Sequence, residues 1–214
     1  MVQNKPARRG RPRAYDPDQA LARARDLFWI QGFSGTSLDE LSVATHMNRP
    51  SLYGAFGDKR AFYRAVLKGY REKMRDDVRL VLDPDVPLRE ALTRLYALFI
   101  GIYFPDDGQP RGCFMISTGV PEAATDPEVR DLMAETFRGF DRMLEKRIAL
   151  AVADGELPAG TDCAILAMIA NSVVGYIAIR SRLGESRETL ESFAAATVDH
   201  ICGKAPSAPV DRDS

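Results

Sequence analysis

The sequence predicts an all-α protein of about nine helices, with three in a small N-terminal module and six in a larger bundle. Apolar residues recur at spacings of three and four along most of the chain, and the alternation typical of strands is nearly absent. Capping residues and Asp-Pro steps repeatedly precede these apolar stretches, and glycines follow them. With 45% hydrophobic and 28% charged residues, the composition is that of an ordinary soluble globular protein.

The first helix is predicted to follow a polar, basic arm over residues 1–15. Asp16 can cap this helix, and Pro17 suits the first helical position. Apolar residues then repeat at helical spacing until Gly32, which we expect to end the helix.

Two short helices are predicted next. Ser37 and Glu40 have the spacing of a capping box, which predicts a helix over residues 38–45. After about three residues Asn48 can cap a second short helix, RPSLYGAF, over residues 49–56.

The rest of the chain predicts six further elements. Asp58 caps a long helix, a second follows Pro87, and residues 105–112 form a loop before the short apolar segment CFMISTGV. Asp126-Pro127 starts the next helix, which ends at Gly155. Thr161 is expected to cap an apolar helix that runs to Leu183, and Ser186 is expected to cap the last helix. Residues 204–214 are expected to form a loose tail.

Charge and cysteine content limit the possible classes of protein. Residues 1–60 carry ten Lys or Arg and six Asp or Glu, a net charge of +4, whereas the remainder carries nineteen and twenty-four, a net charge of −5. This asymmetry fits a small basic module on a larger acidic body. The three cysteines and two histidines have no metal-ligand spacing, so we expect no metal site, no cofactor and no disulfide framework. The absence of a signal peptide predicts a cytoplasmic protein, and a buried bundle helix explains the 17-residue apolar run from Cys163 to Ile179 better than a membrane span does.

The two short helices have the arrangement of a helix-turn-helix packed on a longer leading helix. The second helix is compact and weakly charged, as a helix that enters the major groove must be. Arg49 can donate two hydrogen bonds to guanine, Ser51 can bond a base edge or a phosphate, and Tyr53 can reach the backbone. Helix N-termini near Ser37 and Asp58 favour phosphates, where Lys59 adds a charge. Simple helical packing would give the same periodicity.

The stretch GFSGTSLDELSVATHMNRPSLYGAFGDKRAFY resembles the N-terminal module of the TetR/AcrR family of bacterial repressors. The matching positions are the Gly32-Phe33 step, the Thr36-Ser37 helix start, Leu41 and Ala44, the Leu52-Tyr53-x-x-Phe56 ending, and Lys59. This resemblance covers about residues 15–65 and implies that the chain binds double-stranded operator DNA.

Two positions depart from the family pattern. His46 stands where the turn usually has Gly, so it bears backbone strain if it adopts the left-handed conformation; a slightly different turn is the alternative. Ala55 replaces a polar aromatic residue or His, so the operator sequence does not follow from the resemblance.

We therefore predict a DNA-binding domain at residues 16–60 and a ligand-binding and dimerisation domain at 61–203. The candidate DNA contacts lie in the arm, at the helix starts and on the second short helix: Arg11, Arg13, Thr36, Ser37, Arg49, Pro50, Ser51, Tyr53, Gly54 and Lys59.

The resemblance also implies that the middle helices surround a small-molecule cavity and that the last two helices form a homodimer interface. The candidate cavity residues are mostly aromatic, which suggests a hydrophobic or aromatic effector: Tyr70, Phe99, Tyr103, Cys113, Phe114, Ser117, Phe137, Phe140, Met143, Asn171 and Tyr176. Taken one by one, most of the apolar members fit a core residue better than a ligand contact. Asn171, in an apolar helix, needs a polar partner, which could be a ligand, a water or the second subunit.

The sequence thus predicts a ligand-responsive repressor that binds a palindromic operator as a dimer. The alternative within this class is a redox- or electrophile-sensing repressor, because a helix start and Arg111 could lower the pKa of Cys113 and activate its thiol. An enzyme or a carrier is a second class, but no catalytic group or nucleotide loop supports it, so we expect no catalytic residues. A structural DNA protein is a third class, and the acidic body argues against it.

Overall fold

The computed structural model describes residues 16–105 and 109–203, and all regular elements in these ranges are helical. They are α1 (Pro17–Gly35), α2 (Leu38–Thr45), α3 (Arg49–Phe56), α4 (Lys59–Val81), α5 (Leu88–Tyr103), the π-helix η1 (Met115–Gly119), α6 (Val120–Glu122), α7 (Pro127–Ala153), α8 (Cys163–Arg182) and α9 (Arg187–Cys202). The predicted all-α fold is confirmed. The predicted basic arm and C-terminal tail lie outside the described residues.

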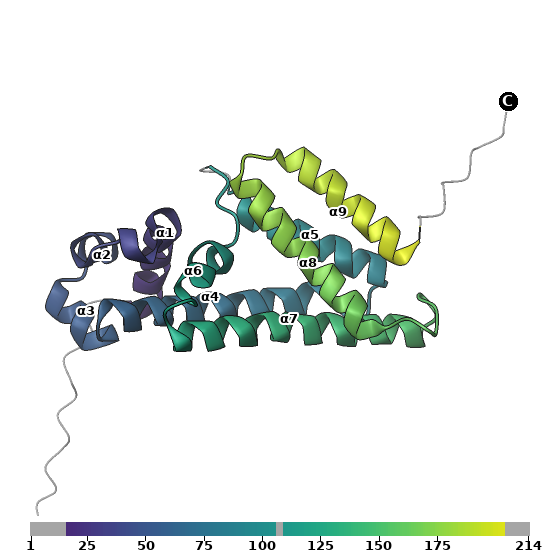
Figure 1. Ribbon diagram of the computed structural model, residues 1–214, viewed down its shortest axis with the longest axis horizontal. Helices are drawn as coiled ribbons and strands as arrows, with labels where there is room; N and C mark the ends of the chain where they lie inside the picture. The colour runs from purple at the N-terminus through teal and green to yellow at the C-terminus, as the bar shows by residue number, and fades with distance from the viewer. Residues whose placement is uncertain (1–15, 106–108, 204–214) are drawn as a thin grey trace, which may run out of the picture.

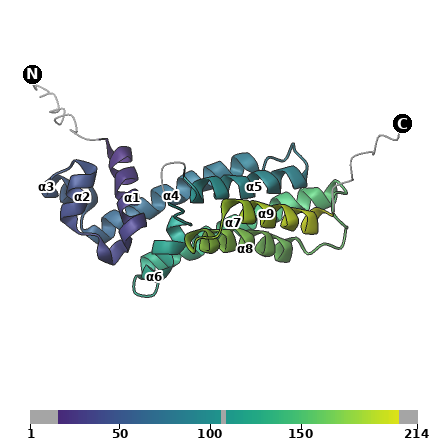
Figure 2. The same cartoon turned by 90° about the horizontal axis from the view of Figure 1, so that it is seen from above.

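The molecule is elongated, with α1, α2 and α3 gathered at one end (Figure 1). The long helix α4 starts in this group and continues through the body, where it packs against α5 and α7. In the body α8 packs mainly on α7, and α9 mainly on α5 (Figure 2). Since α4 belongs to both ends, it links the N-terminal helices mechanically to the body.

Side-chain caps explain where most helices begin. The carboxylate of Asp16 accepts the amides of Asp18 and Gln19, and Asp58 accepts the amide of Ala61 at 2.7 Å. These caps satisfy amides that otherwise lack partners in the first helical turn.

The structure corrects three local expectations. Gly32 interrupts α1 with φ 74° and ψ 173°, but the helical turn resumes after it and ends at Gly35. Asp162, not Thr161, caps α8, because its carboxylate accepts the amide of Ile165 at 3.0 Å. The segment after the loop forms a π-helix, a rare geometry that often occurs at functional sites.

Helix α8 is much less buried than the predicted bundle helix. It is long and apolar enough to cross a membrane by length and composition alone, yet only 33% of its apolar window is buried in the single chain. Its exposed apolar residues recur at helical spacing and thus share one face: Ile165, Met168, Ile169, Tyr176, Ile179 and Leu183.

Candidate nucleic-acid interface and internal cavity

The turn between α2 and α3 has a fixed and strained geometry. His46 adopts the left-handed conformation, with φ 55° and ψ 30°, and is the single non-glycine residue with positive φ among residues 16–105 and 109–203. The amide of Met47 donates to the carbonyl of Ser42, and the buried Met47 side chain anchors the turn to the core. The left-handed alternative for His46 is therefore the one observed.

Replacing His46 with glycine should stabilise the protein. Glycine adopts this conformation without the clash of a Cβ atom, although it also gives the unfolded chain more freedom. We expect a free energy of unfolding higher by about 0.5 kcal/mol, measured by urea denaturation. His46→Ala serves as the control, since it keeps the Cβ atom; equal stability of the two variants would contradict this account.

The outer surface of α3 presents the predicted DNA contacts to solvent. Pro50, Tyr53 and Gly54 are exposed, and Ser51 is half-buried. On the inner side Leu52 is buried, and Phe56 stacks on Phe62 with ring centroids 4.2 Å apart. The helix therefore has a fixed inner face and a free outer face of the size that a major groove accepts.

Arg49 is engaged within the protein. Its Nε donates to Oδ1 of Asp39 at 2.6 Å, across the two helices of the helix-turn-helix. Both side chains are more than half exposed, so the pair contributes little to stability. The guanidinium can therefore leave Asp39 for a base edge at small cost. Sequence reasoning missed this pair because periodicity does not fix the angle between two helices.

The start of α2 offers fewer groups to DNA than the sequence predicts. Thr36 is 1% exposed and its hydroxyl donates to the carbonyl of Gly32 at 2.7 Å, so its side chain is not available to DNA, and this prediction is wrong. Ser37 is exposed, but its amide donates to Glu40 in the predicted capping box. This hydrogen bond lowers the pKa of the Glu40 carboxyl, which therefore stays charged beside the α2 N-terminus. The start of α2 is a weaker phosphate site than the sequence suggested.

Lys59 lies at the start of α4, with its ammonium 4.4 Å from the centre of the Phe33 ring. Partial burial lowers the pKa of this ammonium. The aromatic ring positions the charge beside α3 through a cation–π contact. Arg11 and Arg13 lie outside the described residues.

The body contains an internal cavity of about 40 Å³, measured for the centre of a water molecule. Its walls come from α4, α5, η1, α7 and α8, together with Cys113, which lies just before η1. Seven of the predicted cavity residues line it: Tyr70, Phe99, Tyr103, Cys113, Phe137, Phe140 and Asn171. Six further lining residues were not predicted: Met74, Met115, Ile116, Thr136, Val174 and Gly175.

Four predicted cavity residues do not line it. Phe114 is fully buried and packs on the rings of Trp29, Tyr63 and Tyr70, so it belongs to the core. Tyr176 is half-exposed against Phe193 on the outside of α8. Met143 lines a separate groove rich in arginine. Ser117 is half-buried without reaching the cavity. Helical periodicity gives the inward side of a helix but not which inward residues border a void.

Asn171 has a partner within the same chain. Its amide Nδ2 donates to Oδ1 of Asp141 on α7 at 2.7 Å. The expected ligand, water or second subunit is therefore not needed to satisfy this group. Sequence reasoning could not find the pair because the two residues are thirty positions apart.

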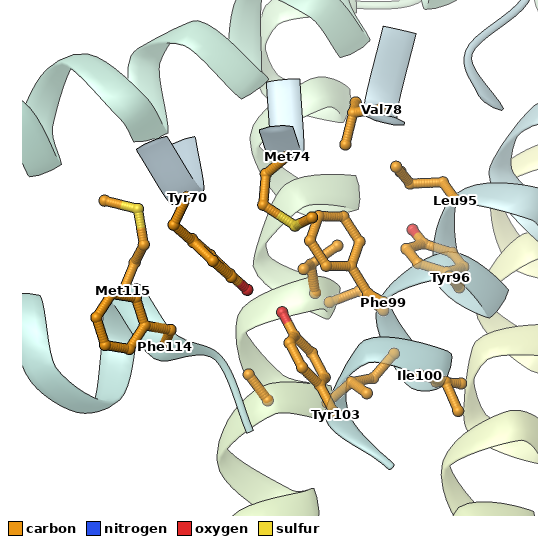
Figure 3. Packing of buried hydrophobic residues seen from close by; sticks show 14 of the residues in the cluster. Tyr70, Met74, Val78, Leu95, Tyr96, Phe99, Ile100, Tyr103, Phe114 and Met115 are labelled. Carbon is orange, nitrogen blue, oxygen red and sulfur yellow. The ribbon is translucent and has the colours of Figure 1, made fainter. Parts of the chain in front are cut away.

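Two tyrosine hydroxyls point toward one another in the cavity region (Figure 3). Tyr70 on α4 is 7% exposed, Tyr103 on α5 is 0% exposed, and neither hydroxyl makes a hydrogen bond of regular geometry, although the Cys113 thiol lies close to both. The thiol of Cys113 is near enough to raise the pKa of both tyrosines, although burial contributes more. Both hydroxyls therefore stay protonated. An unpartnered buried hydroxyl is costly, so this pair is unusual.

A matched pair of tyrosine substitutions tests that cost. The hydroxyl of Tyr96, also on α5 and buried, donates to the carbonyl of Ala170 at 3.2 Å. Tyr96→Phe should lower the free energy of unfolding by about 1 kcal/mol, since a hydrogen bond is lost. Tyr103→Phe should leave it unchanged or raise it, and a thermal denaturation series measures both. An equal loss in the two variants would show that Tyr103 is satisfied in solution.

The Cys113 thiol is not activated in this conformation. Burial raises its pKa, and this outweighs the lowering effect of hydrogen bonds from the amides of Ile116 and Met115. The amides at the helix start lower this pKa as expected, but burial outweighs them, so the expected net lowering is wrong. Gly112, which precedes Cys113, lets the backbone pass close to α8. A Cβ atom at this position, where φ is 63°, would lie 2.5 Å from the carbonyl oxygen of Ala178.

Trp29 connects the cavity to the N-terminal helices. Its ring lies on α1 and contacts those of Tyr70 at 5.6 Å and Phe114 at 5.5 Å between centroids. Its Nε1 donates to the carbonyl of Arg111 at 3.2 Å, in the segment that leads to Cys113. Trp29 thus puts α1 in direct contact with Tyr70, a residue of the cavity wall. Sequence reasoning did not identify this residue, the single tryptophan of the chain.

A second junction lies where α4 and α7 begin. Arg60 donates to Asp126 at 3.1 Å, and Arg64 lies 3.7 Å from the same carboxylate. Burial alone would raise the pKa of Asp126, but Arg60, the helix amides and Arg64 together lower it. This charged junction ties α4, immediately after α3, to the body.

Comparison with known proteins places the chain among bacterial regulators. Residues 20–66 match the family described as "Bacterial regulatory proteins, tetR family", and residues 88–197 match "Tetracyclin repressor-like, C-terminal domain". The chain is 30% identical to the HTH-type transcriptional repressor ComR of Escherichia coli over 192 residues, which cover 89% of this chain and 90% of ComR. It is also 30% identical to the repressor BdcR of Escherichia coli, over 94% of this chain and 97% of BdcR.

Solved structures agree with this placement. A cysteine mutant of the TetR family regulator CifR, in complex with a 26-base-pair operator, is 34% identical with a TM-score of 0.77 over 88% of this chain and 98% of CifR. The reduced form of NemR from E. coli shares the fold, with 22% identity and a TM-score of 0.76 over 89% of this chain and 98% of NemR.

Proposed function

The chain belongs to the TetR family of bacterial transcriptional regulators, and from this premise we propose that it is a cytoplasmic repressor that binds a palindromic operator as a homodimer. A small hydrophobic or aromatic effector releases it. The observation that carries this proposal is the helix-turn-helix, whose second helix, α3, presents an exposed outer face that includes Arg49 and Tyr53. Transcription regulation, not catalysis, is its activity.

We assign residues 16–60 to DNA binding and residues 61–203 to effector binding and dimerisation. On α3, Arg49 reads guanine after leaving Asp39, with Pro50, Ser51 and Gly54 lying against the base edges. Tyr53, Ser37 and Lys59 contact the phosphate backbone, and Arg11 and Arg13 in the arm follow a groove.

The homodimer forms through α8 and α9. Exposed apolar residues share one face of α8, as is typical of a protein–protein interface, and a second copy covers this face. Small residues on α9, such as Ala195 and Ala196, are exposed and let the helices of two protomers approach closely. Two-fold symmetry then places two α3 helices about one DNA turn apart, which a palindrome matches.

Effector binding acts on DNA affinity through the cavity. An effector that prefers one spacing of the two α3 helices shifts the dimer toward that spacing. The ring contact between Tyr70 and Trp29 connects the cavity to α1, and the Arg60–Asp126 junction links α4 to the body.

Selection from a random DNA library tests the proposed function. Immobilised protein is expected to enrich duplexes with two inverted half-sites whose centres lie about 10 base pairs apart. The variant Tyr53→Ala, which removes an exposed phosphate contact, should enrich the same palindrome at lower affinity. Enrichment without any inverted repeat would contradict a dimeric operator-binding repressor.

The second candidate function is sensing of oxidants or electrophiles through Cys113. It is favoured by the position of this thiol on the cavity wall close to the hydroxyls of Tyr70 and Tyr103, and by CifR, which was solved as a cysteine mutant. The raised pKa of Cys113 weighs against it. The test is operator release by N-ethylmaleimide or hypochlorite in Cys113→Ser, with Cys163→Ser as the control. Unchanged release in Cys113→Ser removes this candidate.

A further inference from the structure

We propose that the internal cavity binds a small uncharged molecule with one acceptor oxygen, such as a carbonyl or ether oxygen, which receives hydrogen bonds from Tyr70 and Tyr103 together. This inference rests on the proposed function, because it names the chemistry of the effector.

The first argument is the hydrogen-bonding state of the buried tyrosines. The hydroxyl of Tyr63 donates to Thr118 at 2.9 Å, and that of Tyr96 donates to the carbonyl of Ala170. These two make regular hydrogen bonds within the protein, whereas Tyr70 and Tyr103 have only the Cys113 thiol nearby and make none of regular geometry. Both unsatisfied hydroxyls come from different helices to the same cavity (Figure 3). Buried polar groups are nearly always paired, so a molecule in this cavity is the missing partner.

The second argument is which atoms the cavity offers. The hydroxyls stay protonated, because burial and the neighbouring thiol raise the pKa of both tyrosines, so both can donate. The hydroxyl of Thr136 is already used, since it donates to the carbonyl of Leu132 at 2.7 Å. The amide of Asn171 is likewise held by Asp141. The neighbouring Cys113 thiol is only a weak acceptor, so two donors that face one another select a ligand with an acceptor oxygen.

The third argument is charge. None of the thirteen residues that line the cavity is charged, and most are aromatic, aliphatic or sulfur-containing. An ionised ligand would lose its hydration without gaining a counter-ion, which is strongly unfavourable. The ligand is therefore neutral, and apart from its oxygen it is apolar.

The fourth argument is size. A single water needs roughly 10–15 Å³ by the same measure, so a cavity of about 40 Å³ admits a compact ligand of a few heavy atoms. Met74 and Met115 in the walls are flexible and can adjust to its shape. Because Trp29 contacts the ring of Tyr70, a ligand on that hydroxyl changes the surroundings of the single tryptophan.

The experiment uses the full chain and two probes of one shape, cyclopentanone and cyclopentane. Saturable change in Trp29 emission measures their binding, with N-acetyl-tryptophanamide as the blank for collisional quenching. Cyclopentanone should bind at least about tenfold more tightly than cyclopentane, as expected for hydrogen bonds made in an apolar site.

Tyrosine variants assign the preference to the two hydroxyls. Tyr70→Phe and Tyr103→Phe keep the rings and should each weaken cyclopentanone binding by about tenfold, while cyclopentane binding stays the same or improves. Tyr96→Phe is the matched control, because its hydroxyl is buried but already paired, and it should leave both affinities unchanged.

Several results would overturn the inference: no saturable binding of cyclopentanone, equal affinity for the two probes, no effect of either Phe variant, or tighter binding of cyclopentanecarboxylate. Failure of the proposed function is seen separately, as a lack of sequence-specific DNA binding in the selection experiment, which contains neither probe. A chain that binds its operator but not cyclopentanone would refute only the effector chemistry.

Discussion

Replacing Arg49 with alanine is expected to weaken operator binding by at least about 30-fold, because a bidentate contact to guanine is lost from both half-sites of the palindrome. The fold should persist, since the ion pair with Asp39 lies on the surface and contributes little to stability. Fluorescence anisotropy with a labelled operator measures the affinity, and circular dichroism confirms that the helices are retained.

The matched control is Asp39→Asn, which breaks the same ion pair from the other side. It frees the guanidinium and removes a carboxylate near the phosphates, so operator affinity should stay the same or increase. If both variants lose affinity equally, the ion pair acts only by holding α2 against α3, and Arg49 does not contact the bases.

Disrupting the exposed face of α8 should have a larger effect. Ile169 is 48% exposed in the single chain and lies in the middle of this face. In the proposed dimer, Ile169→Lys buries two unpaired charges, which is strongly unfavourable, so the protein should become monomeric. Each monomer then binds one half-site without the benefit of a linked second site, and operator affinity should fall by about 100-fold or more.

Light scattering coupled to size-exclusion chromatography measures the mass of this variant, and anisotropy measures its affinity. The control is Leu80→Lys, which places the same charge at an isolated apolar residue on α4 that is 76% exposed. That variant should remain dimeric. A dimeric Ile169→Lys protein with unchanged operator affinity would place the interface elsewhere.

The sequence predicted those parts of the structure that depend on neighbouring residues. The capping box of Ser37 and Glu40, the Asn48 cap and the Asp58 cap are local, and each defines a helix start as predicted. The cap of α8 lies one residue later than predicted, because the Thr161 hydroxyl donates to the carbonyl of Pro158 and the carboxylate of Asp162 accepts the amide of Ile165.

Contacts between distant segments could not be predicted in this way. The partners of Arg49 and Asn171 lie on other helices, and a helical period says nothing about the angle or register of two helices. Phe114 and Phe140 are both predicted to line the cavity, yet Phe114 fills the core and Phe140 borders the cavity.

The central claim is that α3 of a dimer recognises one palindromic sequence. A salt titration with the selected palindrome and a scrambled duplex of equal length tests it most directly. We predict two protomers per duplex and a preference for the palindrome of about 1,000-fold or more near physiological salt. Binding of both duplexes with the same affinity and the same steep dependence on salt would contradict it, because such binding depends on the phosphates alone.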